Sequence, residues 1–166
     1  MGLALSLIDE DASAAGFAGA TTAATMMAIV HRRYGRPGVL DHTEVDKPVV
    51  GDDDVLVRVH AAAVHPGDYF IMTGVPTVVR VAFGLRRPRN GIRGMDVAGR
   101  VEAVGRSVQG LESGDAVFGR SSTGTLAEYT RAPADNFAPK PVNLSMEQAA
   151  AIPVSGLCRD KVKSRK

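Results

Sequence analysis

The sequence from Gly94 reads Gly94-Met95-Asp96-Val97-Ala98-Gly99-Arg100-Val101-Glu102-Ala103-Val104-Gly105, and Gly114-Asp115-Ala116-Val117-Phe118-Gly119 follows shortly after. Valine-rich runs bounded by glycine are typical of short strands entered through tight turns, because glycine reaches positive φ without steric cost. Upstream, Val55, Val57 and Val59 alternate with Arg58 and His60, which is the period of a half-buried strand. These patterns predict a mainly β fold with short helices, arranged as a barrel or partly open β-barrel.

Further elements follow from the same rules. Strands are expected at residues 28–32, 40–45, 55–60, 97–104, 116–118 and 126–131. Pro66 suits the first position of a short helical turn over residues 68–72. Ser145 and Gln148 have the spacing of a capping box, which predicts a helix to about Ile152. Residues 75–93 form a long, arginine-rich connection whose structure the sequence does not specify.

The composition indicates one globular domain with an aliphatic core. Hydrophobic residues make up 45% and charged residues 23% of the 166, and Trp is absent. The net charge of +2 argues against a polyanionic partner for the whole domain, so no nucleic-acid function is expected. Cys158 is the one cysteine, which excludes an intrachain disulfide and indicates a reducing, cytoplasmic location. No apolar run approaches the roughly 20 residues that span a bilayer.

Three segments are distinguished along the chain. Residues 1–25 are mostly small and predict a flexible N-terminal extension or a weak helix. Residues 26–157 carry the strand patterns and form the predicted domain. Residues 158–166 are a basic, atypical tail.

Two more blocks accompany the glycine-bounded runs: His65-Pro66-Gly67-Asp68-Tyr69, and Ala149-Ala150-Ala151-Ile152-Pro153-Val154-Ser155-Gly156-Leu157. In this order the blocks resemble the catalytic, GroES-like domain of the medium-chain dehydrogenase/reductase family. The resemblance is greatest to its zinc-free, quinone-reductase-like, NAD(P)-dependent branch, and it extends from about Met27 to Leu157. It implies that the nucleotide-binding Rossmann domain, which follows this point in the family, is missing from this chain.

The cofactor expectation rests on glycine spacing. A dinucleotide phosphate cradle is usually built as G-x-G-x-x-G at a helix N-terminus, and no two of the 18 glycines are separated by a single residue. The resemblance implies NADP or NAD as the cofactor of the full-length enzymes. We expect this chain alone to bind it poorly, unless another chain supplies the missing half.

The resemblance assigns the candidate site. It implies that His65 and Tyr69 are catalytic, and that His65, Asp68 and Ser155 lie against the cofactor. Imidazole and phenol can donate hydrogen bonds to a carbonyl or quinone oxygen that gains charge. The alternative is structural: His65 would cap the turn at Pro66, and Tyr69 would pack on the barrel. For His65 the two interpretations are equally supported, whereas for Asp68 and Tyr69 the structural one is favoured.

No metal site is expected. Zinc-dependent relatives carry ligands at positions that correspond here to His65, Met95, Asp96 and the vicinity of Pro153. Methionine and proline do not serve as zinc ligands, and catalytic zinc needs about three nitrogen, sulfur or carboxylate ligands. His65 with Asp96 is the remaining metal alternative. The other histidines, His31, His42 and His60, are expected in surface strands or turns.

The leading hypothesis is therefore the substrate-side domain of a zinc-independent oxidoreductase. It would reduce a quinone, enone or small carbonyl compound by hydride transfer from NADPH or NADH, and as this chain alone it would be inactive. The alternative is a non-catalytic GroES-like interaction or assembly module, which would form a homo-oligomer through an exposed apolar face. A weaker third hypothesis is phosphate or nucleic-acid binding by the arginine cluster.

Overall fold

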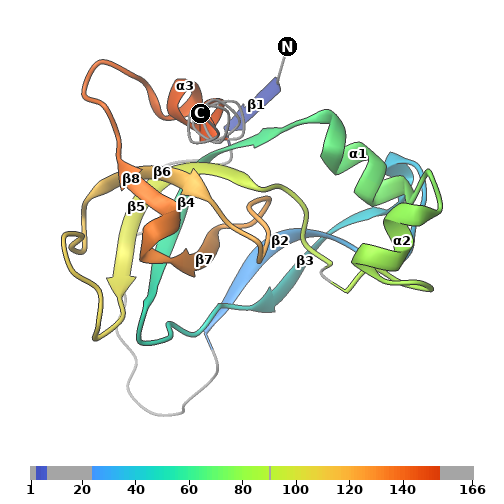
Figure 1. Cartoon of the computed structure of the whole chain (residues 1–166), viewed down its shortest axis with the longest axis horizontal. Helices are drawn as coiled ribbons and strands as arrows, with labels where there is room; N and C mark the ends of the chain where they lie inside the picture. The colour runs from blue at the N-terminus through green and yellow to red at the C-terminus, as the bar shows by residue number, and fades with distance from the viewer. Residues whose placement is uncertain (1–2, 7–23, 90, 154–166) are drawn as a thin grey trace, which may run out of the picture.

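The computed structural model describes residues 3–6, 24–89 and 91–153. These residues form a six-stranded antiparallel sheet and a separate two-stranded one (Figure 1). The larger sheet comprises β1 (Leu3–Ser6), β4 (Asp54–Val64), β5 (Asp96–Val104), β6 (Ala116–Arg120), β7 (Tyr129–Pro133) and β8 (Phe137–Pro139). The smaller comprises β2 (Thr25–His31) and β3 (Leu40–Asp46).

Strand β4 is the centre of the larger sheet. One edge pairs with β5 along most of its length, while the other edge pairs with β7 through residues 54–58 and with β1 through residues 61–64. β6 then pairs with β5, and β8 with β6. All these pairings are antiparallel, so the described part of the chain contains no parallel β-α-β unit.

The two sheets are joined by single bridges rather than by a continuous ladder. Leu126 accepts a hydrogen bond from the Ile29 amide, and Glu128 accepts one from the Val59 amide, both at 2.8 Å. The stretch between β6 and β7 thus links β2 to β4. Among the described strands the pairing order does not close on itself. The prediction of a mainly β, partly open barrel is confirmed.

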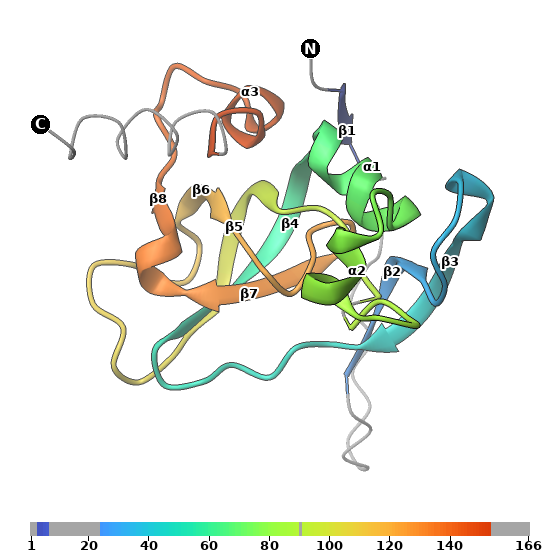
Figure 2. The same cartoon turned by 45° about the vertical axis from the view of Figure 1, so that its right-hand side comes forward.

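Within the described part of the chain, three short α-helices lie outside the strands (Figures 1 and 2). α1 (Pro66–Thr73) and α2 (Val78–Phe83) pack against each other, and α3 (Met146–Ala150) packs over β1, β4, β5 and β6. Single 3-10 turns occupy Pro37–Val39 and Ala134–Asn136. The described helices are too short to cross a membrane.

The core is aliphatic, as predicted. Val55, Val57 and Val59 are buried against residues of the neighbouring strands, and Phe137 is the aromatic member of this cluster. Leu56, on the opposite face of β4, is also buried. A second, smaller cluster lies beneath α3, where Ala61 and Ala98 meet Ala149 and Ala150. Alanine on both sides lets this helix approach the sheet closely.

Several predicted boundaries needed correction. Leu3–Ser6, within the predicted N-terminal extension, form β1, which alternation in so short a segment could not reveal. Strand β7 begins at Tyr129 rather than residue 126, because residues 126–128 make the bridging bonds described above. The 75–93 connection contains α2. The capping box at Ser145 is confirmed, because the backbone N–H of Gln148 donates to Ser145 Oγ at 3.2 Å. The helix α3 ends at Ala150 rather than at about Ile152.

One glycine of the opening motif is required by packing. A Cβ at Gly99, in the middle of β5, would lie 2.1 Å from the carbonyl oxygen of Arg58 on β4. Such a separation is far inside van der Waals contact, so any side chain would force the two central strands apart. Gly38 is a suitable comparison, because a Cβ there would meet nothing within 4 Å.

We predict that Gly99→Ala lowers the free energy of unfolding by about 3 kcal/mol, at the upper end of ordinary overpacking costs. Gly38→Ala should change it by less than about 0.5 kcal/mol, as surface substitutions usually do. Urea unfolding followed by circular dichroism measures both. Equal stability of the two variants would show that the β4–β5 approach is not as close as described.

Candidate active-site face

Helix α1 begins directly after β4 and is fixed by a reciprocal cap. His65, the N-cap, accepts a hydrogen bond from the Gly67 amide through Nδ1 at 2.9 Å. Asp68 in turn accepts one from the His65 amide through Oδ2 at 3.0 Å. Pro66 occupies the first helical position, where the missing N–H costs nothing. The sequence therefore specifies the helix start at the end of the central strand.

The cap determines the state of the His65 ring. Because Nδ1 accepts a hydrogen bond from an amide, the proton of the neutral ring is on Nε2. Nε2 lies 3.7 Å from Asp68 Oδ2, beyond hydrogen-bonding distance, and it is buried without a hydrogen-bond partner among the described residues. The structural interpretation of His65 as a helix cap is confirmed. A catalytic role stays a prediction.

Charged residues gather at the same end of the sheet. Asp96, the first residue of β5, lies opposite Ala63 of β4 and opposite Arg120, the last residue of β6. The Asp96 carboxylate and the Arg120 guanidinium form an ion pair at 3.8 Å, and Asp96 is only 3% exposed. We call His65, Asp68, Arg93, Asp96 and Arg120 the polar sheet end.

Arg93 supplies a buried positive charge beneath α1. The residue is 8% exposed, and burial lowers the pKa of its guanidinium, while the charge of Asp68 opposes that shift. Arginine remains charged under such perturbation. Asp68 is itself 4% exposed, so each charge offsets part of the desolvation cost of the other. The Arg93 and Asp68 pair thus places two opposite charges near the start of α1.

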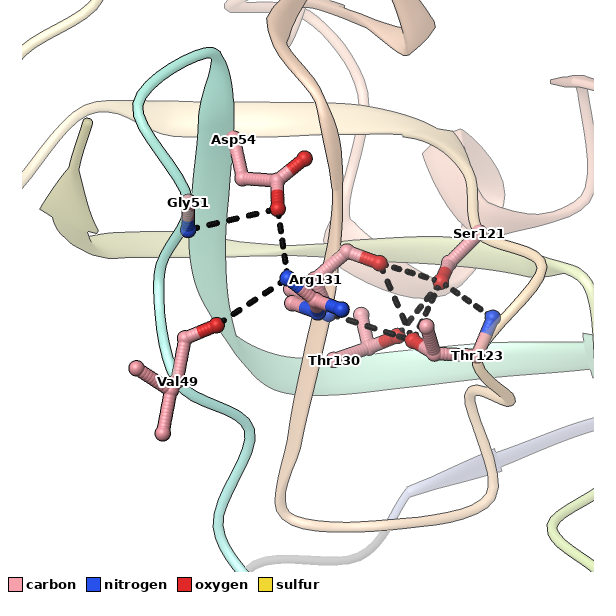
Figure 3. Close-up of polar contacts among 7 residues, drawn as sticks. All are labelled: Val49, Gly51, Asp54, Ser121, Thr123, Thr130 and Arg131. Carbon is pink, nitrogen blue, oxygen red and sulfur yellow. Dashed lines mark hydrogen bonds and ion pairs between the residues drawn. The ribbon is translucent and has the colours of Figure 1, made fainter.

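The loop that follows Arg120 is held by a hydroxyl network (Figure 3). Thr130 Oγ1 donates to Ser121 Oγ at 2.7 Å, and Ser121 Oγ donates to the Arg131 carbonyl oxygen at 2.8 Å. Thr123 Oγ1 donates to the same carbonyl at 3.0 Å. These bonds fix the end of β6 against β7 and so hold Arg120 in place.

Arg131 ties this network to the start of β4. Its Nη1 donates to Asp54 Oδ2 at 2.7 Å and to the carbonyl oxygen of Val49 at 3.1 Å (Figure 3). Asp54 Oδ2 also accepts a bond from the Gly51 amide. The contacts of Arg131 with Asp54 and Val49 lie at the opposite end of β4 from His65 and join the network to the start of that strand.

The comparisons with known proteins agree with this architecture. Residues 51–142 match the alcohol dehydrogenase GroES-like domain family. The chain belongs to this family. Its membership in the medium-chain dehydrogenases/reductases, expected from the sequence motifs, is thereby confirmed. The matched residues fall within the predicted domain of residues 26–157, whose exact ends stay a prediction.

Individual relatives are quinone and enone reductases by name. The chain is 37% identical to the quinone oxidoreductase of Sus scrofa over 135 residues, covering 80% of this chain and 39% of that protein. It is 35% identical to the 2-methylene-furan-3-one reductase of Solanum lycopersicum, covering 78% of this chain and 34% of that protein. The chain thus spans about two-fifths of the length of such relatives.

Solved structures show the same domain. The quinone oxidoreductase from Coxiella burnetii superposes with a TM-score of 0.73 at 29% identity, over 86% of this chain and 45% of that one. A mycobacterial protein solved in complex with NADPH superposes with a TM-score of 0.69, also at 29% identity, over 84% of this chain and 40% of that one.

The other predicted site residues differ in their exposure to solvent. Tyr69 lies on α1 with its side chain 52% exposed and its ring edge-on to Phe70. About half of its surface is covered, so the packing of Tyr69 on the barrel and its catalytic role both stay predictions. Asp68 is buried in the helix cap, as the structural interpretation expected. Ser155 lies outside the described residues.

The metal alternative of His65 with Asp96 finds no support in the geometry. His65 Nδ1 is used by the helix cap, and the Asp96 carboxylate is paired with Arg120. Within residues 24–89 and 91–153, no three histidine, cysteine or acidic side chains come together as a metal site would require.

Two arginines of the polar sheet end were missed at the sequence level. Arg93 comes just before the Gly94 motif, and Arg120 directly follows Gly119. A charged residue placed next to a buried valine-rich strand is the signal that could have identified them. Arg93 was instead counted with the exposed arginines of the 75–93 connection.

The structure also contains a groove away from these residues. It has a volume of about 540 Å³ and lies between the β2–β3 hairpin and the stretch that precedes β7. Its polar lining includes Lys47, which sits 3.6 Å above the Tyr129 ring and 3.2 Å from Glu102. His65, Asp68 and Tyr69 do not line it, so this groove is separate from the polar sheet end.

The prediction that His31 lies on the surface is wrong. Its side chain is fully buried at the end of β2, where Nδ1 donates to the Gly91 carbonyl oxygen at 2.8 Å. Burial lowers the pKa of His31 below its ordinary value of 6.5, and the nearby charge of Arg93 lowers it further. A strand-end histidine looks the same in sequence whether it faces solvent or a neighbouring loop. His42 is exposed, as predicted.

We predict that His31 makes the protein acid-sensitive. A histidine with a lowered pKa in the folded state takes up protons preferentially when unfolded, so the free energy of unfolding falls as the pH drops below about 6.5. His31→Asn keeps a donor for Gly91 and should flatten this dependence between pH values of about 6.5 and 5. His60, whose pKa is also lowered by burial, should retain part of the slope.

Urea unfolding at a series of pH values measures this effect. His42→Asn is the matched control, and it should leave the slope unchanged. An unaltered slope in His31→Asn would contradict the assignment.

Proposed function

We propose that this chain supplies the substrate-side domain of an NAD(P)H-dependent oxidoreductase that reduces a quinone, an enone or another small carbonyl compound by hydride transfer. The observation that carries the proposal is the capped start of α1 at the polar sheet end, with Tyr69 exposed on the same helix. The names of the relatives support the reaction class. The substrate class and the reaction of the whole protein belong to this proposal.

The residues at the start of α1 have two proposed roles: some position the helix, and one contacts the substrate. His65 and Asp68 hold the helix start, so they orient the turn that carries Tyr69. The Tyr69 hydroxyl, which makes no hydrogen bond within the described structure, would donate to a carbonyl or quinone oxygen of a bound substrate. Such a donor stabilises the negative charge that develops on oxygen during reduction.

The described residues do not fit the dinucleotide itself. The sequence has no Gly-x-Gly pair, and the described strands pair only in antiparallel fashion, so no phosphate-binding turn between a parallel strand and a helix is present there. The proposal therefore places the phosphates of NADP or NAD on polypeptide other than these residues. His65, Asp68 and Ser155 remain the residues proposed to face its nicotinamide end, and zinc is not part of the proposal.

The first consequence concerns turnover. We predict that the purified chain alone oxidises NADPH with a quinone at a negligible rate, because the loss of a positioned cofactor removes about 7–11 kcal/mol of proximity effect. Steady-state NADPH absorbance with a small quinone measures this. Binding of the quinone alone, measured by calorimetry, should persist and should weaken about tenfold in Tyr69→Phe, for one lost hydrogen bond.

Tyr129→Phe, in the separate groove, is the matched control and should bind the quinone normally. Turnover at the rate of a complete enzyme would contradict the placement of the cofactor elsewhere. Failure of the chain to bind any quinone or enone would contradict the substrate-side assignment.

One observation favours a second candidate function, a non-catalytic GroES-like interaction module that forms a homo-oligomer. Val75, Val78, Val81 and Leu85 are each more than half exposed. Exposed apolar patches of this kind commonly mark an interaction surface. An increase in molecular size with concentration, together with no quinone binding, would support this function over the oxidoreductase.

A further inference from the structure

The segment of residues 75–89, which includes α2, exposes apolar side chains to solvent, unlike an ordinary surface helix. The exposed fractions of its apolar side chains are 57% for Val75, 69% for Val78, 68% for Val81, 41% for Phe83 and 68% for Leu85. None of the residues in α2 is buried. A water-facing helix normally presents polar residues to solvent and buries its apolar face.

The polar side of this segment is the side that holds it to the protein. Arg80 Nε donates to the Gly74 carbonyl oxygen at 3.1 Å, and its guanidinium lies 4.8 Å from the centre of the Tyr34 ring. The Tyr34 hydroxyl donates to the carbonyl oxygen of Gly84, at the end of α2. The segment is thus anchored by polar contacts, and these leave the valines and Phe83 facing outward.

The charges around the apolar residues have one sign. Arg86, Arg87 and Arg89 are exposed, and among the described residues no ion pair joins them to an acidic side chain. Between Tyr69 and Met95 the sequence contains no aspartate or glutamate. Apolar side chains beside unpaired arginines match the chemistry of an anionic lipid surface, where the apolar groups enter the headgroup boundary and the cations meet phosphate.

From this combination we infer that residues 75–89 dock the protein onto anionic lipid bilayers. A second copy of the chain, which the second candidate function would place on these valines, is a poorer occupant, because a two-fold contact would bring together two segments that each carry arginines and no acidic residue. Nucleic acid would use the arginines but would leave the exposed aliphatic side chains without a function. The inference goes beyond the proposed function, because lipid binding does not depend on oxidoreductase activity.

The inference also bears on substrate supply. α2 packs against α1, which carries Tyr69. If the substrate is a lipid-soluble quinone, as the proposed function allows, docking would bring α1 close to the bilayer that holds it. This consequence rests on the proposed function, whereas the docking itself does not.

Vesicle co-sedimentation of the full chain tests the inference. We expect binding to vesicles of phosphatidylcholine with phosphatidylglycerol, weak binding to phosphatidylcholine alone, and loss of binding at high salt. Replacing Arg86, Arg87 and Arg89 by alanine should lower the partition coefficient roughly 100-fold, at about 1 kcal/mol for each arginine. Val78→Ser with Val81→Ser should lower it by a similar factor on both lipid compositions.

Two control variants match these changes elsewhere on the surface. Alanine at Arg58, Arg100 and Arg106, all exposed, removes the same charge, and Val49→Ser with Val142→Ser removes two exposed valines. Both should bind vesicles like the unaltered chain, with unchanged circular dichroism for every variant. Absence of vesicle binding would overturn the inference. So would equal losses in the control variants, or a size increase with concentration that Val78→Ser with Val81→Ser abolishes while no vesicles are bound.

Discussion

The structure depends on the close approach of β4 and β5 at Gly99. Because no side chain separates this residue from the Arg58 carbonyl, the two central strands can pair closely here. The register shifts between Val59 and Ala61, and the antiparallel pairing then continues to Ala63 and Asp96. A shift by one residue would reverse which side chains face the core. The same register sets Asp96 beside the start of α1 and opposite Arg120. The position of the polar sheet end therefore depends on the pairing of β4 with β5 beyond that shift.

The tightly packed sheet contrasts with the more exposed helices at its edge. The valine core, the hydroxyl network around Ser121 and the alanine contact under α3 fix the sheet. α1 and α2 extend beyond it, with their exposed side chains available for contact with other molecules (Figure 2). Functional residues commonly lie at the edge of a rigid scaffold, because the scaffold holds them in position.

The sequence predicted the parts that local rules control. Alternating valines located β4, the glycine pattern located β5 and β6, and capping rules located α1 and α3. Burial that depends on distant contacts could not be predicted. His31 is buried by the Gly91 loop 60 residues away, and Arg93 is covered by elements far apart in sequence. The cap at His65 follows from the local sequence around Pro66, whereas the placement of Arg93 near Asp68 depends on the tertiary fold.

The central claim is that the start of α1 is where a substrate meets this domain. Amide chemical shifts of the isotope-labelled chain, recorded while a small quinone is added, test that claim most directly. The account predicts saturable shifts at His65, Gly67 and Tyr69 and at Met95, with β3 and the groove beside Tyr129 unaffected. Shifts confined to that groove, or none at saturating quinone, would contradict it.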